Sequence, residues 1–124
     1  MPYHNVLAKI KGSKKPEEIV ILGAHLDSFD GGTGAADNGA GFRGMMEAMR
    51  LLAKSGAKPR RTILMIGFAG EELGCKGALS FVQRHAGDLD KVVMLLNRDT
   101  RPGALTGITV TTKWQRVYDS WTLD

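Results

Sequence analysis

The sequence predicts an α/β fold, a three-layer sandwich in which helices cover both faces of a mostly parallel central sheet. Apolar, β-branched runs alternate with segments of helical periodicity, as expected when parallel strands are joined by crossover helices. The chain has 124 residues, 43% of them hydrophobic, which suits one modest core and leaves no room for a second domain. We therefore expect a single domain spanning residues 1–124.

Several apolar segments are predicted to be strands. The first alternates apolar and polar residues up to Gly12, which is typical of a half-buried strand, and a turn is expected to follow it. Three later runs are continuously apolar, which is typical of strands covered on both faces. The predicted segments are the half-buried strand 5–12, the turn 12–18, the covered strands 19–26, 62–70 and 91–100, and an edge strand at 107–112.

Three segments have helical periodicity. The clearest is 42–54, in which three methionines lie on an apolar face that we expect to pack in the core, and Gly56 provides a C-terminal stop. A shorter helix is predicted at 77–87. The tail 113–124 carries an aromatic face that must cover another surface, and this face is formed by Trp114, Val117, Tyr118 and Trp121.

Composition excludes several classes of function. The formal net charge is +4, but the basic residues are scattered and no basic stripe with interleaved aromatics suggests nucleic-acid binding. No stretch approaches the ~20 apolar residues of a membrane span, and the first residues carry no export signal. Cys75 is the only cysteine, which excludes an intrachain disulfide and a cysteine-rich zinc site, and we expect it to be a small buried residue.

Charged side chains gather where the predicted covered strands end. Because such ends meet at one edge of a parallel sheet, their carboxylates would repel one another unless a cation lay among them. One imidazole with several carboxylates and no thiolate suits zinc, and also manganese or cobalt. The candidate residues are His25, Asp27, Asp37, Glu71, Glu72 and Asp99.

Each candidate also has a simpler explanation when taken alone. A histidine at a strand end is often a satisfied core residue, and Asp37 could cap the following helix. Glu71 and Glu72 could be acids in the first turn of a helix, where they complement the helix dipole, and Asp99 could belong to a turn. The ordered occurrence of all these motifs in one short chain favours the metal site.

The ordered motifs resemble those of metallopeptidase family 28, whose members are co-catalytic di-zinc exopeptidases. The motifs are His25-x-Asp27, Asp37 in GAADNGAG, the pair Glu71-Glu72 in FAGEELG, and Asp99 at a strand end. The family includes secreted aminopeptidases and plasma glutamate carboxypeptidase-like enzymes. The segments HLDSFDGGTGAADNGAG and RPGALTG look closer to the second group.

This resemblance implies a role for each of the six residues. His25 and Asp99 would bind one metal ion, Glu72 the other, and Asp37 would bridge the two. Asp27 would orient the imidazole by a hydrogen bond, while Glu71 would be the general base that takes a proton from a metal-activated water and passes it to the leaving amine. The resemblance also implies a cis peptide bond between Asp37 and Asn38.

Family members complete the second metal site with a histidine far towards the C-terminus. This sequence ends at Asp124, so we expect a domain shortened at its C-terminus, in which one metal ion is bound or in which the histidine is replaced. The other histidines, His4 and His85, match no family motif. A shortened domain would also leave the sheet uncovered, and a homodimer through the sheet or through the Trp114/Trp121 helix would protect it.

The resemblance implies a zinc-dependent exopeptidase that removes terminal residues from short peptides, with two divalent metal ions as cofactors. Two alternatives remain open at this stage. The chain could be a non-catalytic metal-binding remnant of such a peptidase, or an interaction module that uses the aromatic C-terminal helix. Family members are often secreted or periplasmic, but the sequence itself gives no location.

Overall fold

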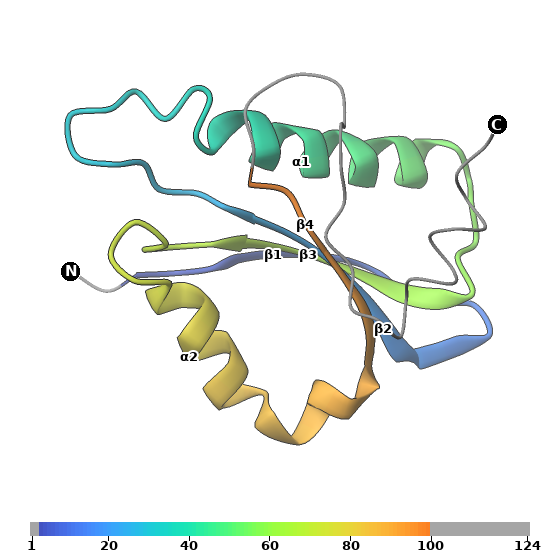
Figure 1. Ribbon diagram of the computed structural model, residues 1–124. Helices are drawn as coiled ribbons and strands as arrows, with labels where there is room; N and C mark the ends of the chain where they lie inside the picture. The colour runs from blue at the N-terminus through green and yellow to red at the C-terminus, as the bar shows by residue number, and fades with distance from the viewer. Residues whose placement is uncertain (1–2, 100–124) are drawn as a thin grey trace, which may run out of the picture.

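The computed structural model describes residues 3–99. Its order of elements confirms the predicted alternation of strands and helices (Figure 1). The elements are β1 (Val6–Ile10), β2 (Lys15–His25), α1 (Gly39–Lys54), β3 (Arg61–Phe68), α2 (Lys76–Arg84), the 3-10 helix η1 (Ala86–Lys91) and β4 (Val92–Asn97).

The four strands form one sheet in the order β1-β3-β2-β4. β2 pairs in parallel with β3 and with β4, whereas β1 pairs antiparallel with β3. The sheet is therefore mostly parallel, as predicted. Because β2 and β3 have neighbours on both sides, their apolar runs are more deeply buried than β1, whose residues are largely exposed at the edge.

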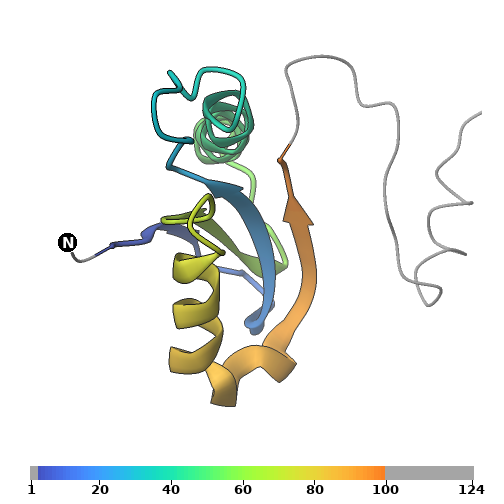
Figure 2. The ribbon, with the colours of Figure 1, turned by 60° about the vertical axis from the view of Figure 1, so that its left-hand side comes forward.

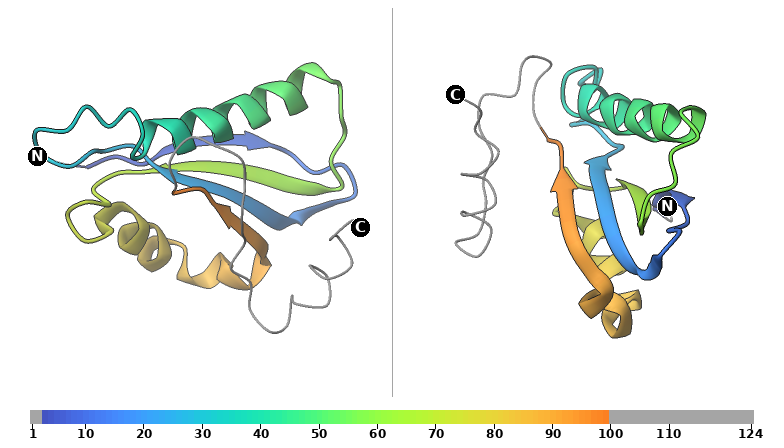
Figure 3. Two further views of the ribbon diagram at one scale, coloured as in Figure 1. Left: turned by 45° about the horizontal axis from the view of Figure 1, so that its top comes forward. Right: turned by 90° about the vertical axis from the view of Figure 1, so that its right-hand side faces the viewer.

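Helices cover both faces of the sheet, which confirms the three-layer sandwich. α1 lies along one face, and α2 with η1 lies on the other (Figures 1 and 2). Figure 3 shows the same arrangement from above and along the sheet edge. Each helix connects parallel strands, so that β2, β3 and β4 all end at the same edge of the sheet.

The main hydrophobic cluster lies between α1 and the sheet. Leu22 of β2, Met65 of β3 and Met49 of α1 are buried there, and Phe42 and Met45 pack against them. Met46 is 51% exposed, so the prediction that all three helix methionines pack in the core is wrong for this one. Met46 lies at the border of the apolar stripe of the helix, next to the face that is exposed to solvent.

The predicted element boundaries change in several places, and β4 ends at Asn97, not at residue 100. The predicted turn 12–18 is partly strand, because β2 begins at Lys15 and pairs with Arg61 before a register shift between Lys15 and Ile19. α1 begins three residues earlier than predicted, at Gly39. The segment predicted as one helix over 77–87 is α2 followed by η1, with the break at His85.

Two predicted elements lie outside the described residues: the edge strand 107–112 and the aromatic helix of 113–124. The homodimer expected through that helix stays a prediction. Within residues 3–99, no helix combines the length and apolar character needed to cross a membrane.

Candidate metal centre

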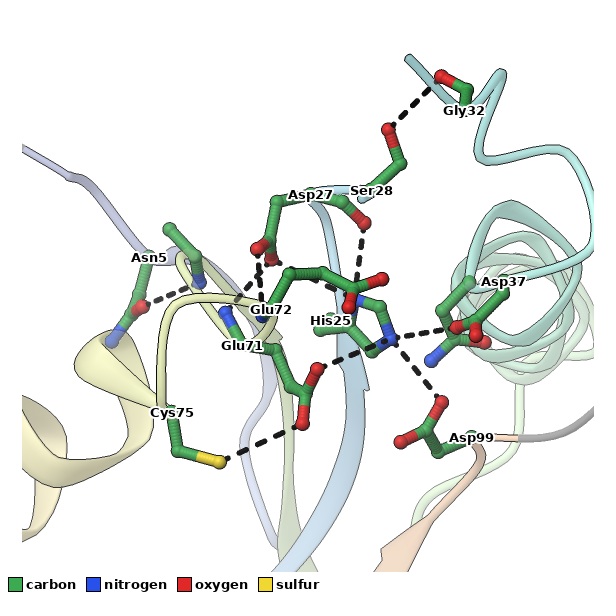
Figure 4. A network of polar contacts seen from close by, with 12 residues as sticks. Asn5, His25, Asp27, Ser28, Gly32, Asp37, Glu71, Glu72, Cys75 and Asp99 are labelled. Atoms are coloured by element: carbon green, nitrogen blue, oxygen red, sulfur yellow. Dashed lines mark hydrogen bonds and ion pairs between the residues drawn. The ribbon is translucent and has the colours of Figure 1, made fainter. Parts of the chain in front are cut away.

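The predicted site residues meet at the carboxyl edge of the parallel strands (Figure 4). His25 is the last residue of β2, Glu71 and Glu72 lie in the turn after β3, and Asp99 follows β4 by two residues. Asp37 reaches the same place from the loop that leads into α1. Three other segments of the chain therefore converge on the imidazole at the end of β2.

The His25 ring is the centre of this group. Its Nε2 atom lies 3.1 Å from Oδ1 of Asp37, 3.2 Å from Oδ1 of Asp99 and 4.0 Å from Oε2 of Glu71. The side chain of His25 is 3% exposed, whereas those of Asp37 and Asp99 are 72% and 41% exposed. The imidazole is thus fixed inside the protein while the carboxylates around it face solvent.

The hydrogen bonding of this ring is suited to a cation. Nδ1 of His25 lies 3.0 Å from the main-chain carbonyl oxygen of Asp27, which can only accept a hydrogen bond, so Nδ1 carries a proton. In the neutral ring, Nε2 then presents a lone pair to two carboxylate oxygens, and three acceptors face one another. A bound metal ion resolves this conflict, because imidazole nitrogen and carboxylate oxygen are both metal ligands.

In the absence of a metal ion, a proton relieves the same conflict. Burial of the ring opposes its charged form, but the carboxylates of Asp99, Asp37 and Glu71 outweigh burial and raise the pKa of His25. The raised pKa and the three facing acceptors have the same cause, which is an excess of negative charge around Nε2.

Among residues 3–99, two groups of side chains offer ligand atoms within 4.8 Å of one another, and both contain His25. The first, His25 with Asp37 and Asp99, is the set predicted for one metal ion. The second places Glu72 with His25 and Glu71, not with Asp37. The pairing of Glu72 with Asp37 at a second metal ion therefore stays a prediction.

Asp27 contacts both the His25 ring and the turn after β3, and its predicted role in orienting the imidazole stays a prediction. Its carboxylate lies 3.6 Å from Nδ1 of His25, and the main-chain carbonyl provides the contact to the ring. The carboxylate accepts hydrogen bonds from the main-chain N–H groups of Glu71, at 3.0 Å, and Glu72, at 3.1 Å. Burial opposes the charged form, but these N–H groups outweigh it and lower the pKa of Asp27. Asp27 thus holds the turn that carries both glutamates.

The helix-capping and helix-dipole explanations do not hold for three of the residues. Asn38, not Asp37, is the N-cap of α1, and the Asn38 side chain makes no capping hydrogen bond. The first turn of α2 contains no acid, because Glu71 and Glu72 lie in the turn before it. The peptide bond from Asp37 to Asn38 is cis, as the resemblance implied.

Comparison with known proteins places these features in a family. The sequence model of peptidase family M28 matches residues 5–120 of this chain. The chain belongs to peptidase family M28. Similar proteins include ones named carboxypeptidase and zinc aminopeptidase, which agrees with the predicted class of enzyme.

The curated relatives are much longer than this chain. Carboxypeptidase Q of Rattus norvegicus is 36% identical over 107 residues, which cover 86% of this chain and 23% of that protein. The probable glutamate carboxypeptidase VP8 of Zea mays is 35% identical over 77% of this chain and 14% of that protein. The chain thus spans about a quarter or less of the relatives it matches.

Solved structures show the same fold. A peptidase M28 precursor from Shewanella amazonensis aligns with a TM-score of 0.74 and 43% identity, over 77% of this chain and 22% of that one. BSAP, a zinc aminopeptidase from Bacillus subtilis, aligns with a TM-score of 0.71 and 31% identity, over 77% of this chain and 24% of that one. The described α/β sandwich therefore has the fold of the matching part of both proteins.

Three residues around the M28 motifs were missed or misjudged. Asn5 joins the two ends of the 69–77 segment, since its side chain accepts from the N–H of Ala69 at 3.1 Å and donates to the carbonyl of Gly77 at 2.9 Å. No sequence pattern indicated this role. Asn38 is 1% exposed and could have been noticed as a favoured N-cap residue before a helix.

Cys75 is exposed, so the expectation of a buried cysteine is wrong. Its thiol lies 3.6 Å from Oε1 of Glu71, at the left-handed residue before α2 (Figure 4). Partial desolvation and the neighbouring carboxylates, Glu71 first among them, raise the pKa of this thiol.

A cavity of about 540 Å³ opens beside the centre. His25, Glu71 and Asp99 lie on its wall, and most of the remaining lining is apolar side chains of the sheet and of α2, among them Phe68 and Phe81. The carboxylates of the centre are thus reached from a space large enough for a small ligand.

Proposed function

We propose that this chain carries the catalytic centre of a zinc-dependent exopeptidase that acts on short peptides. His25, Asp37 and Asp99 would hold one divalent metal ion, and Glu72 would hold a second together with Asp37. The observation that carries the proposal is the Nε2 atom of His25, which faces two carboxylate oxygens at 3.1 and 3.2 Å with its lone pair. Such a set of acceptors is suited to a cation.

The bound metal ions would supply Lewis acidity, which polarises the scissile carbonyl and makes water a stronger acid. The general base is Glu71, whose Oε2 atom lies 4.0 Å from Nε2 of His25 and is partly exposed. This carboxylate would take a proton at Oε2 from the attacking water and deliver it to the leaving amine. It lies on the cavity wall, so a peptide can reach it.

Asp27 would support this reaction without touching the substrate. Its carboxylate fixes the main chain of Glu71 and Glu72, and its carbonyl fixes the Nδ1–H tautomer of His25. The base and the metal ligand are therefore oriented by the same residue, which reduces the reorganisation needed during the reaction.

Metal content tests the proposal directly. Protein purified without chelator should contain two zinc ions per chain by elemental analysis, and both Asp99→Ala and Glu72→Ala should lower this number. Asp30→Ala, in the exposed part of the same loop as Asp37, is the matched control and should not. One metal ion that is lost with Asp99→Ala alone would support the metal-binding remnant, and no metal ion at all would refute the proposal.

Hydrolysis tests the role of Glu71. Glu71→Gln keeps the size of the side chain but removes the proton acceptor, so release of terminal residues from a panel of short peptides should fall by about 10²–10⁴-fold. The zinc content should stay at the wild-type value. A loss of zinc in this variant would mean that Glu71 is a ligand, as its grouping with His25 and Glu72 also permits.

A further inference from the structure

Asn38 connects the two carboxylates that face His25. Its side chain is buried, at 1% exposure, and its Nδ2 donates to the main-chain carbonyl of Arg98 at 2.8 Å. Asn38 directly follows Asp37, and Arg98 directly precedes Asp99. One hydrogen bond, from the Asn38 side chain to the Arg98 main chain, therefore joins the neighbours of both predicted ligands across 60 residues of sequence.

The main chain of Arg98 is also hydrogen-bonded to β2, the strand that carries the imidazole of His25. Its N–H donates to the carbonyl of Gly23, two residues before His25, at 2.9 Å. The carbonyl of the same residue accepts from Asn38. The residue after the end of β4 is thus held on one side by β2, which ends in His25, and on the other by Asn38, the residue that follows Asp37.

Gly41 allows this close approach. A Cβ atom at this position would lie 2.0 Å from Oδ1 of Asn38 and 2.5 Å from the carbonyl oxygen of Arg98. The first turn of α1 therefore packs closely against both partners of the hydrogen bond, Asn38 and Arg98. Oδ1 of Asn38 has no hydrogen-bond partner among the described residues, so the Nδ2 donor is the polar contact that its side chain makes there.

We propose that Asn38 is a positioning residue, whose amide sets the separation of Asp37 and Asp99 and thereby forms the metal site around His25. The inference rests on the proposed metal-binding function. Residues that orient metal ligands from outside the coordination shell commonly change affinity when they are replaced. Asn38 acts in this way through the backbone next to two ligands at once.

Asn38→Ser provides the test. Serine is as favourable as asparagine at the N-cap of a helix, so the start of α1 should be preserved, but its short side chain cannot reach the Arg98 carbonyl as the amide does. Gly41→Ala is a second variant, which keeps the amide and displaces it. Gly44→Ala is the matched control, because the nearest atoms that its Cβ would meet belong to the flexible side chain of Arg98, the first of them at 3.0 Å.

The measurement is titration of the 124-residue chain with Co²⁺, followed by its visible absorption and, for the metal-free protein, by far-ultraviolet circular dichroism. Asn38→Ser and Gly41→Ala should weaken Co²⁺ binding about 10–100-fold and change the absorption bands, which report coordination geometry. Gly44→Ala should bind as the wild type does. All metal-free variants should keep the wild-type circular dichroism.

The outcomes separate this inference from the proposed function. Wild-type protein that binds no Co²⁺ would overturn both. If the wild type binds Co²⁺ and Asn38→Ser binds it with the same affinity and the same absorption spectrum, only the role of Asn38 is overturned. Loss of folded structure in metal-free Asn38→Ser would also overturn it, because the amide would then support the fold instead of arranging the carboxylates.

Discussion

Replacing Asp27 by asparagine tests whether its carboxylate holds the turn that carries Glu71 and Glu72. The carboxylate accepts two main-chain N–H groups, at 3.0 and 3.1 Å. Asparagine has the same shape but only one acceptor oxygen, so its NH₂ group would face the second N–H. A hydrogen bond to a charged group contributes about 1.5–3 kcal/mol, and we expect Asp27→Asn to lower the free energy of unfolding by about 2 kcal/mol.

The assay is urea unfolding of the metal-free protein at about pH 7, with Asp30→Asn as the control for loss of a charge in the same loop. The pH dependence adds a second test. The pKa of Asp27 is lowered in the folded protein from its ordinary value of 3.8, so its contribution is complete above pH 3.8 and is lost as the pH falls through the folded-state pKa. The difference between wild type and Asp27→Asn should therefore shrink in acid.

Two results would refute this reasoning. A loss of less than about 0.5 kcal/mol at neutral pH is the usual effect of a surface substitution and would mean that the two N–H groups do not depend on Asp27. A difference that stays constant between neutral pH and about pH 3 would mean that the charge of the carboxylate is not the cause.

Three further predictions concern the core, the 69–77 segment and the thiol. Met49→Ala should lower the free energy of unfolding by about 2–5 kcal/mol in urea, because Met49 is buried, whereas exposed Met46→Ala should change it by less than about 0.5 kcal/mol. Asn5→Ala should weaken zinc binding measured by calorimetry, because the segment that carries the proposed ligand Glu72 loses the two hydrogen bonds of the Asn5 side chain, and unchanged binding would contradict this. Cys75 should be alkylated in the native protein, and because its pKa is raised from 9.0 the rate should still increase above that pH; a plateau below pH 9 would refute the shift.

Much of the fold could be predicted because its signals are local. The apolar runs of β2 and β3 and the helical periodicity of α1 depend only on neighbouring residues, and all three elements occur as predicted within a few residues. Met46 was misjudged because it lies at the border of the apolar stripe, where only the packing decides which side faces solvent. The prediction of one helix over 77–87 missed the break at His85, where α2 ends and the 3-10 helix η1 begins.

The sequence by itself determined which residues are available for a metal centre and the order of strands and helices that brings them to one edge, since parallel strands share their carboxyl ends. Only the tertiary structure decided how these residues contact one another. It showed that the Asp27 carboxylate holds the Glu71–Glu72 turn while its carbonyl holds His25, and that Asn38 joins the neighbours of two carboxylates. The contacts of the Asp27 carboxylate and of Asn38 link residues far apart in the chain, and their distances follow from the packing of the elements, which no local pattern encodes.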